Sequence, residues 1–491
     1  MDPIILDSSS IQIMNNTYEG LMRIYEGELV EALAASYTVS DDGLTYTFHL
    51  RDAKWSDGKT ITADDFIFAW FRMLDPALDN YYSSQFFYIV NAQEYFNGEC
   101  AAEDVGMKAI DEKTIEVTLV APTPYFLTLT AYNVYFPARE DIVDNEGAWS
   151  RSPETYVTCG PFVMSEYNIN ENMVLTKNEN YWNAEAVNLD KIEISFMEDS
   201  SSVLTAFRSG DIDIFKGVPA QEIAALQAED PEFYSLPVLA TRFYRFNMEK
   251  APFDNADVRK ALSMAIDRSA LVENVTKQGE IPAPGVVTHD IYCSDGVEYR
   301  QAAGDYNLDM TQAKVEEAQK LLADAGYPNG EGFPEVTLAI NNDESAIAMA
   351  NAVQQMWKEN LGIQIKIETV EAAALSERRA NGDFYLTVNG WSADYPDPMT
   401  FLSIFVTGNG MNTGFFSNAE FDQLINDSMT LEGTERDRAL IRAEQILVEE
   451  DAAIIPLYEG AETAMVRSTV TNWDKSGFSG WFFGYADIAA K

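Results

Sequence analysis

The residues best placed to do chemistry lie in one short segment, from Phe384 to Pro396. Its first half alternates apolar and polar side chains and predicts a strand that faces a core and ends near a glycine. Trp391, Asp394 and Tyr395 would then lie at a strand end, where open α/β sheets tend to bind ligands. An aspartate beside a tryptophan can hold a ligand ammonium by a charge-assisted hydrogen bond. The alternative is that Asp394 only orders its own loop, as in an Asx turn, and the segment alone leaves both interpretations open.

Two other kinds of site, a glycosidase carboxylate pair and a phosphate-binding loop, have weaker support. A glycosidase pair of carboxylates stays open, because such pairs come together only in the fold. Most acids in so acidic a chain are nevertheless solvated surface groups. Gly58-Lys59-Thr60 resembles the end of a phosphate-binding loop, but the required earlier glycine position holds Ala53. No nucleophile and base stand in a recognisable pattern.

Histidine and cysteine are scarce. The two histidines are far apart, and the three cysteines (Cys100, Cys159 and Cys293) form no CxxC pair. This pattern excludes the usual structural zinc sites and a dense disulfide framework. No cofactor is expected, and the cysteines are either buried free thiols or include one disulfide.

Composition limits the class of protein. The 491 residues suggest about three domains or lobes. With 33 Lys+Arg against 79 Asp+Glu, the net charge is 33 − 79 = −46, which makes nucleic acid a poor partner and an anionic membrane surface a repelling one. No apolar run is long enough to span a bilayer. The start, Met1-Asp2-Pro3, shows no export signal. We therefore expect either a cytosolic protein or one whose export segment has been removed.

The surrounding pattern predicts an α/β fold with mixed sheets, and its elements are a hairpin, three helices and a βαβ unit. The expected hairpin covers 37–51, the helices begin near 62, 255 and 311, and the βαβ unit covers 336–367. The second helix is expected to run from Asn255 to Val275. The sequence has no flexible linker between independent domains, and this favours interleaved lobes joined by short crossovers.

A series of motifs, in order through nearly the whole chain, resembles the extracellular solute-binding proteins of the oligopeptide/dipeptide class (family 5), which serve ABC importers. The longest is the stretch from Lys54 to Phe66. The others are Tyr18–Leu21, Asp75-Pro76, Gly160–Phe162, Asn180–Trp182, Phe207–Asp213, Phe246-Asn247, Pro252–Asn255, Val258–Leu262, Ile266–Arg268, Gly390–Tyr395 and Met411–Thr413.

The resemblance implies a two-lobed, periplasmic-binding-protein-like (type II) fold with an extra domain inserted in the first lobe. The first lobe would be discontinuous, comprising 1–40, 155–242 and 465–491. The extra domain would cover 41–154 and the second lobe 243–464.

The resemblance also implies a binding site. Asp394 would hold the α-ammonium of a peptide, and the strand end at Asn389 and Gly390 would pair with the peptide backbone. Arg379 would meet a peptide carboxyl end, although Val388 replaces the second arginine that some relatives offer there; the alternative is that Arg379 is only a surface charge at a helix end beside Arg378. The remaining residues expected at the site are Trp391, Tyr18, Glu19, Asn247 and Asn412. A disulfide found in some members is expected to be absent, because Ala240 and Ser392 occupy its positions.

The function implied is non-enzymatic. The protein would capture short peptides in a cleft between its lobes and deliver them to the permease subunits of an ABC transporter. By the same resemblance it would be an extracytoplasmic monomer, periplasmic or held at the cell surface by a lipid anchor, with its signal segment absent from this chain. The alternatives are a carrier of another small solute, such as an oligosaccharide, a receptor that feeds a signalling pathway, and a glycoside hydrolase.

Overall fold

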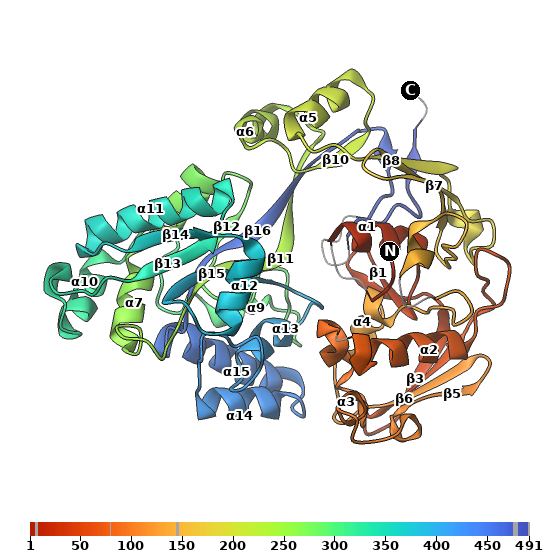
Figure 1. Ribbon diagram of the computed structural model, residues 1–491, viewed down its shortest axis with the longest axis horizontal. Helices are drawn as coiled ribbons and strands as arrows, with labels where there is room; N and C mark the ends of the chain where they lie inside the picture. The colour runs from red at the N-terminus through yellow and green to blue at the C-terminus, as the bar shows by residue number, and fades with distance from the viewer. Residues whose placement is uncertain (5–7, 79, 144–146, 475–479, 490–491) are drawn as a thin grey trace. The chain divides into compact units, whose positions relative to one another are not determined.

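The structure is a computed structural model that describes residues 1–4, 8–78, 80–143, 147–474 and 480–489. The chain divides into two compact units (Figure 1). Unit 1 comprises Met1–Phe215 and Val466–Lys491, and unit 2 is the continuous segment Lys216–Met465. The division into three parts expected from the sequence stays a prediction. Among the described residues, no helix is both long and apolar enough to cross a membrane.

Unit 1 contains several small antiparallel sheets. A four-stranded sheet has the order β3 (Ala34–Val39), β4 (Thr45–Leu50), β6 (Thr114–Thr118) and β5 (Met107–Asp111). Its first two strands form the hairpin predicted from the sequence. The smaller sheets pair β1 (Met22–Tyr25) with β2 (Glu28–Glu31), β8 (Asn172–Lys177) with β7 (Phe162–Asn168) and β9 (Lys191–Ser195), and β17 (Val470–Thr471) with β18 (Asp487–Ile488).

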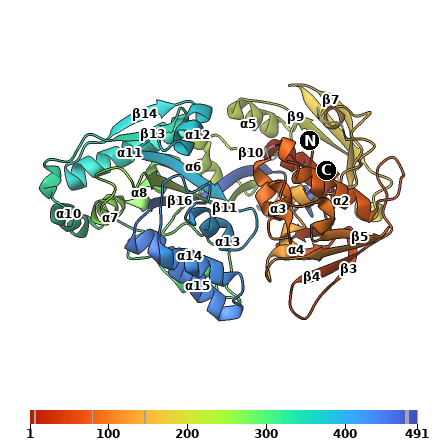
Figure 2. The ribbon, with the colours of Figure 1, turned by 60° about the horizontal axis from the view of Figure 1, so that its bottom comes forward.

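The helices of unit 1 include one that the sequence marked clearly. They are α1 (Ser8–Thr17), α2 (Ala63–Met73), α3 (Ala92–Phe96), α4 (Phe126–Leu129) and α5 (Ser200–Ser209). The helix predicted to begin near Thr62 is α2, which packs against β5 (Figure 2). Its first turn is fixed by Asp65, whose carboxylate accepts from the Thr62 N–H at 2.8 Å and from the Trp55 indole at 3.1 Å. The long motif from Lys54 to Phe66 is therefore in part a helix-start structure.

Unit 2 is built on one mixed sheet. The strand order is β10 (Ile214–Lys216), β16 (Ile454–Val466), β11 (Phe233–Phe246), β15 (Leu386–Ser392), β13 (Thr337–Asn341) and β14 (Lys366–Val370), with β12 (Ile281–Pro282) also paired to β16. Strand β13 is parallel to both β14 and β15, whereas β11 is antiparallel to β15 and β16. The predicted βαβ unit is β13–α11–β14, since α11 (Glu344–Leu361) connects two parallel strands.

One face of this sheet is covered by helices that enclose the main core of unit 2. The core joins apolar residues of α7 (Ala256–Met264), α10 (Val315–Asp324) and α11 to those of β11, β13 and β15 (Figure 1). Trp357 is fully buried there, and its indole donates to the Leu262 carbonyl at 2.8 Å. The other helices of unit 2 are α6 (Ala220–Glu229), α8 (Arg268–Leu271), α9 (Tyr299–Ala303), α12 (Ala372–Ala380), α13 (Met399–Leu402), α14 (Ala419–Ser428) and α15 (Gly433–Gln445).

Two helix predictions were wrong in their bounds. The helix expected from Asn255 to Val275 stops at Met264 and resumes as α8 after Asp267, whose side chain accepts from the Ala270 N–H. The break lets the buried Arg268 guanidinium donate to the carbonyls of Ser263 (3.1 Å) and Pro456 (2.7 Å). The helix expected from Thr311 begins at Val315, because Asp309 binds the Thr311 N–H in a turn.

All three cysteines carry free thiols, with Cys159 and Cys293 buried and Cys100 partly exposed. The structure therefore matches the alternative of buried free thiols at Cys159 and Cys293 but not at Cys100, which is partly exposed. Ala240 and Ser392, named above as the positions of a missing disulfide, lie directly opposite each other in the pairing of β11 with β15.

Candidate ligand-binding site

Strand β15 has one fully paired edge and one edge that is paired only at its start. All seven residues from Leu386 to Ser392 pair with β11. On the other edge, β13 pairs with Leu386 and Thr387 only. In the part of the chain that the structure describes, no strand continues this edge along residues 388–392. On this side the stretch therefore lacks a strand neighbour, and another extended chain could take that place. We call residues 388–392 on this side the open edge.

Asp394 follows directly after the open edge and is only 5% exposed. Its N–H donates to the Thr400 hydroxyl oxygen at 3.1 Å, and the Trp391 indole N–H donates to the same oxygen at 3.2 Å. Thr400 itself is buried in α13. One hydroxyl thus fixes both the tryptophan ring and the backbone that carries the carboxylate.

The loop that carries Asp394 is also held by a residue farther along the chain, Arg436 in α15. The Arg436 guanidinium donates two hydrogen bonds, at 2.9 and 2.8 Å, to the carboxylate of Asp397. A bidentate arginine–carboxylate pair of this kind is geometrically strict. The Asp397 carboxylate also accepts from the Met399 N–H at 2.9 Å, at the start of α13. Asp394 is consequently a nearly buried acid on a fixed support, an environment in which a carboxylate favours a cationic partner.

Gly390 is closely approached by β11. A Cβ atom at this position would lie 2.6 Å from Nη1 of Arg242 and 3.0 Å from the Thr241 carbonyl oxygen. Arg242 on β11 therefore lies across the strand at Gly390, and any side chain at this position would have to push the Arg242 side chain aside.

Asn389 and Arg379 both bind main-chain groups of the open edge. The Asn389 side-chain oxygen accepts from the Gly390 N–H at 2.8 Å. Arg379, at the end of α12, donates to the Val388 carbonyl at 3.2 Å and to the Ser376 hydroxyl at 3.1 Å. Partial burial lowers the pKa of the Arg379 guanidinium from its usual range. The structure therefore brings five of the expected residues together in unit 2: Arg379, Asn389, Gly390, Trp391 and Asp394.

Tyr18 and Glu19 lie in unit 1 with their side chains buried. The Tyr18 hydroxyl donates to the Val157 carbonyl at 2.9 Å, and burial raises its pKa well above the usual value. The Glu19 carboxylate is 1% exposed. It accepts from Arg23 at 2.9 Å, from the Tyr181 hydroxyl at 3.1 Å and from the Trp182 indole at 2.5 Å. Both carboxylate oxygens of Glu19 accept hydrogen bonds from side chains of unit 1. These bonds give Glu19 a structural role within that unit.

Asn247 and Asn412 order loops of unit 2. The Asn247 amide donates to the Gly382 carbonyl at 2.9 Å and its oxygen accepts from the Glu249 N–H. The Asn412 amide donates to main-chain carbonyls, among them that of Phe416 at 2.7 Å. Both side chains are nearly buried, so neither geometry offers a polar atom to a ligand.

Three residues of this region were not expected from the sequence: Thr400, Arg436 and Arg242. Thr400 is only six residues beyond Asp394, in the helix that follows the loop, so its nearness in the sequence was the one available signal. Arg436 and Arg242 carried no such signal, because their partners are far away in the chain.

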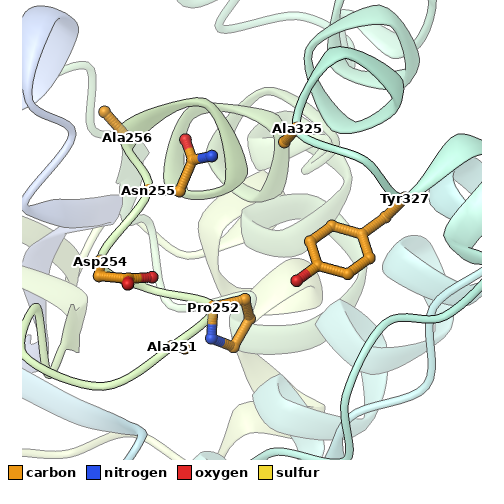
Figure 3. A pocket seen from close by; sticks show the side chains of 7 residues that line it. All are labelled: Ala251, Pro252, Asp254, Asn255, Ala256, Ala325 and Tyr327. Atoms are coloured by element: carbon orange, nitrogen blue, oxygen red, sulfur yellow. The ribbon is translucent and has the colours of Figure 1, made fainter.

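A surface cavity of about 570 Å³ lies elsewhere in unit 2 (Figure 3). It is lined by residues before and within the start of α7 and just after α10, namely Ala251, Pro252, Asp254, Asn255, Ala256, Ala325 and Tyr327. None of the nine expected site residues lines it, and Asn255 uses its side-chain oxygen to cap α7. We therefore regard the open edge, and not this cavity, as the candidate ligand-binding site. Among the described residues, no group of three or more histidine, cysteine or acidic side chains could hold a metal ion.

The chain matches a sequence profile described as bacterial extracellular solute-binding proteins, family 5 (middle), over residues 28–413. It belongs to this family. The oligopeptide-binding protein OppA of Bacillus subtilis is 34% identical over 467 residues, covering 93% of this chain and 84% of that protein. The family affiliation inferred from the motifs is thus confirmed.

Solved structures of family 5 proteins share the fold. A periplasmic oligopeptide-binding protein (OppAIV) of Borrelia burgdorferi superposes with a TM-score of 0.84 at 34% identity, covering 99% of this chain and 97% of that one. The Listeria monocytogenes OppA bound to peptide gives a TM-score of 0.83 at 28% identity, covering 100% and 97%. The α/β, two-lobed fold class with mixed sheets is confirmed.

Proposed function

We propose that this family 5 protein is the substrate-binding protein of an ABC importer and that it binds short peptides. Asp394 would hold the peptide α-ammonium, and the open edge of β15 would pair with the peptide backbone. The observation that carries the proposal is the nearly buried Asp394 carboxylate next to that edge. Relatives named for oligopeptide binding, and one solved with a peptide bound, support it.

The two halves of this site suit a ligand of varied sequence. Every peptide with a free N-terminus carries an ammonium group, so one acid can serve all of them. Main-chain pairing along a strand edge is likewise independent of side chains. Trp391 adds apolar surface beside the acid, and its ring is fixed by Thr400. We assign no ligand contact to the side chains of Tyr18, Glu19, Asn247 and Asn412.

The location, oligomeric state and partners of the protein are proposed from its family membership alone. Members of family 5 are described as bacterial and extracellular. We infer that this chain works outside the cytoplasmic membrane as a monomer, tethered by a lipid anchor, and passes its ligand to permease subunits. It is proposed to have no enzymatic activity.

The first experiment is native mass spectrometry of the freshly purified protein, followed by denaturation and sequencing of the released ligand. A set of adducts that resolve into short peptides is the expected result. A single non-peptide mass would contradict the proposal and identify a carrier of another solute.

The second experiment is Asp394→Asn, a substitution that keeps the shape and removes the charge. Titration calorimetry should show the affinity for a free-amine tripeptide falling by about 2–5 kcal/mol, since the ammonium loses a buried partner. An N-acetylated tripeptide should bind both proteins equally weakly. Asp324→Asn, at an exposed site in α10, makes the same charge change and should leave the affinity unchanged. Equal binding by Asp394→Asn and the wild type would remove Asp394 as the anchor.

A further inference from the structure

The open edge of β15 presents its main-chain groups in a fixed direction. Alternate residues of a strand point their N–H and C=O groups to the same side. The Ala393 N–H donates to the Leu239 carbonyl, beyond the last pair of β11 with β15, so the odd-numbered residues face β11. Val388 and Gly390 consequently face the open edge.

Both of these residues are already bonded by side chains of unit 2. The Gly390 N–H donates to the Asn389 side-chain oxygen at 2.8 Å. The Val388 carbonyl accepts from Arg379 at 3.2 Å, and more weakly from the Thr387 hydroxyl at 3.3 Å, which donates mainly to the Ala339 carbonyl at 3.0 Å. The donor and the acceptor that a neighbouring strand would use first, just past the end of β13, are thus both occupied.

These two contacts have a physical reason. A bare strand edge is an adhesive surface that invites pairing with another chain. Covering it with local side chains satisfies its polar groups at little cost, because neither side chain leaves its own neighbourhood. Arg379 suits this task because its guanidinium has no carboxylate partner within the part of the chain that the structure describes.

We propose that Asn389 and Arg379 are displaceable covers of the open edge, and that they set the affinity of the site by competing with the ligand backbone. This inference rests on the proposed function. An added strand has to take the Gly390 N–H, so the Asn389 side chain must swing away before it pairs. At the Val388 carbonyl, which can accept two hydrogen bonds, the added strand competes with Arg379. Arg379 then acts on the empty state of the strand, which differs from the carboxyl-binding role expected from the sequence.

The test compares wild type, Asn389→Ala and Arg379→Met by titration calorimetry after co-purified ligand has been removed. The probe is alanine tetrapeptide with a free amine and an amidated C-terminus, which offers no terminal carboxylate. Each variant should bind the peptide about two- to tenfold more tightly than wild type, the range expected when one competing hydrogen bond is lost. Arg378→Met is the matched control, because Arg378 pairs with Glu368 instead of β15, and it should bind like wild type.

Hydrogen exchange gives a second reading on the empty proteins. The segment containing Gly390 should exchange faster in Asn389→Ala than in wild type, and peptide should protect it in both. Weaker binding by either variant would overturn the inference and make that side chain a ligand contact. The free-acid form of the tetrapeptide is titrated in parallel, and a loss of affinity in Arg379→Met that is confined to this form would overturn the inference for Arg379 and establish the carboxyl-binding role instead. Affinities of both variants equal to that of wild type would also overturn the inference that the two side chains compete with the ligand. A wild type that binds no peptide would overturn the proposed function itself.

Discussion

At Thr400 a single hydroxyl oxygen accepts from two groups of the site. It bonds the Trp391 indole and the Asp394 N–H, and it is itself almost inaccessible to solvent. A residue in this position need not touch a ligand to affect binding, because it sets where the acid and the ring lie. Shifts of less than an ångström matter for a charge-assisted hydrogen bond.

Thr400→Val should weaken the binding of free-amine peptides by about tenfold, or about 1.4 kcal/mol. The substitution preserves shape but leaves two donors without their acceptor. Thr400→Ser keeps the hydroxyl and should bind like wild type. The measurement is calorimetric titration with a free-amine tripeptide and its N-acetylated form, and only the first should respond. Equal affinities for the valine and serine variants would contradict this positioning role.

The sequence could place Asp394 just past a strand end but could not predict the partners of Glu19. The ligand role of Asp394 stays a prediction. Asp394 has a local signal, since an alternating strand, a tryptophan and the acid follow one another within a few residues. The partners of Glu19 include Tyr181 and Trp182, which are over 160 residues away in the chain. Only the fold brings them together, so a carboxylate expected to line a cleft proves to be fully bonded inside unit 1.

Among the elements, β15 is the one on which the site depends, and its register against β11 is exact enough to test. Ser392 lies opposite Ala240. Since even-numbered residues of β15 turn their main-chain groups to the open edge, this is a pair without hydrogen bonds between the two residues. In such pairs the side chains are closest, with Cβ atoms about 4.5–5.5 Å apart.

The double variant Ala240→Cys, Ser392→Cys should therefore form a cross-strand disulfide on mild oxidation, after a small adjustment of the backbone. Mass spectrometry of a non-reducing digest should find the linked peptides, with Cys100, Cys159 and Cys293 remaining free thiols. Ala240→Cys combined with Trp391→Cys places the second thiol on the other face and serves as the control. A link in the control but not in the direct pair would show a different register.

Element prediction succeeded where hydrophobic period alone determines structure. The βαβ unit has strict alternation in its strands and a long apolar helix face, and β13–α11–β14 matches it. The run from Asn255 to Val275 has an equally good helical period, but it breaks at 265–267. The cause is a buried arginine that binds carbonyls of α7 and β16, and no local pattern reveals that demand.

The whole molecule carries a net charge of −46, far from balance. Such a field attracts cationic ligands and repels anionic ones, and salt screens it within about 8 Å at physiological ionic strength. Charge should therefore affect how fast a peptide arrives even where it barely affects how well the peptide fits.

We expect a lysine-containing tripeptide to associate faster than its glutamate analogue, by roughly tenfold at about 10 mM salt. The two association rate constants should converge as salt is raised to about 0.5 M, whereas a glutamine analogue should respond little. Stopped-flow tryptophan fluorescence provides the measurement. Equal rates for the two charged peptides at low salt would mean that the acidic groups do not act on the path to the site.

Unit 2 is a single uninterrupted stretch whose two ends lie on neighbouring strands. Lys216 on β10 pairs with Glu462 on β16 at 2.9 Å, and the Gly217 N–H donates to the Thr463 carbonyl. A segment with adjoining ends can be exchanged as one piece without redirecting the chain on either side of it. One recombination event with breakpoints near 215 and 466 would replace the entire segment that carries Asp394. Ligand choice could in this way be inherited separately from the rest of the protein.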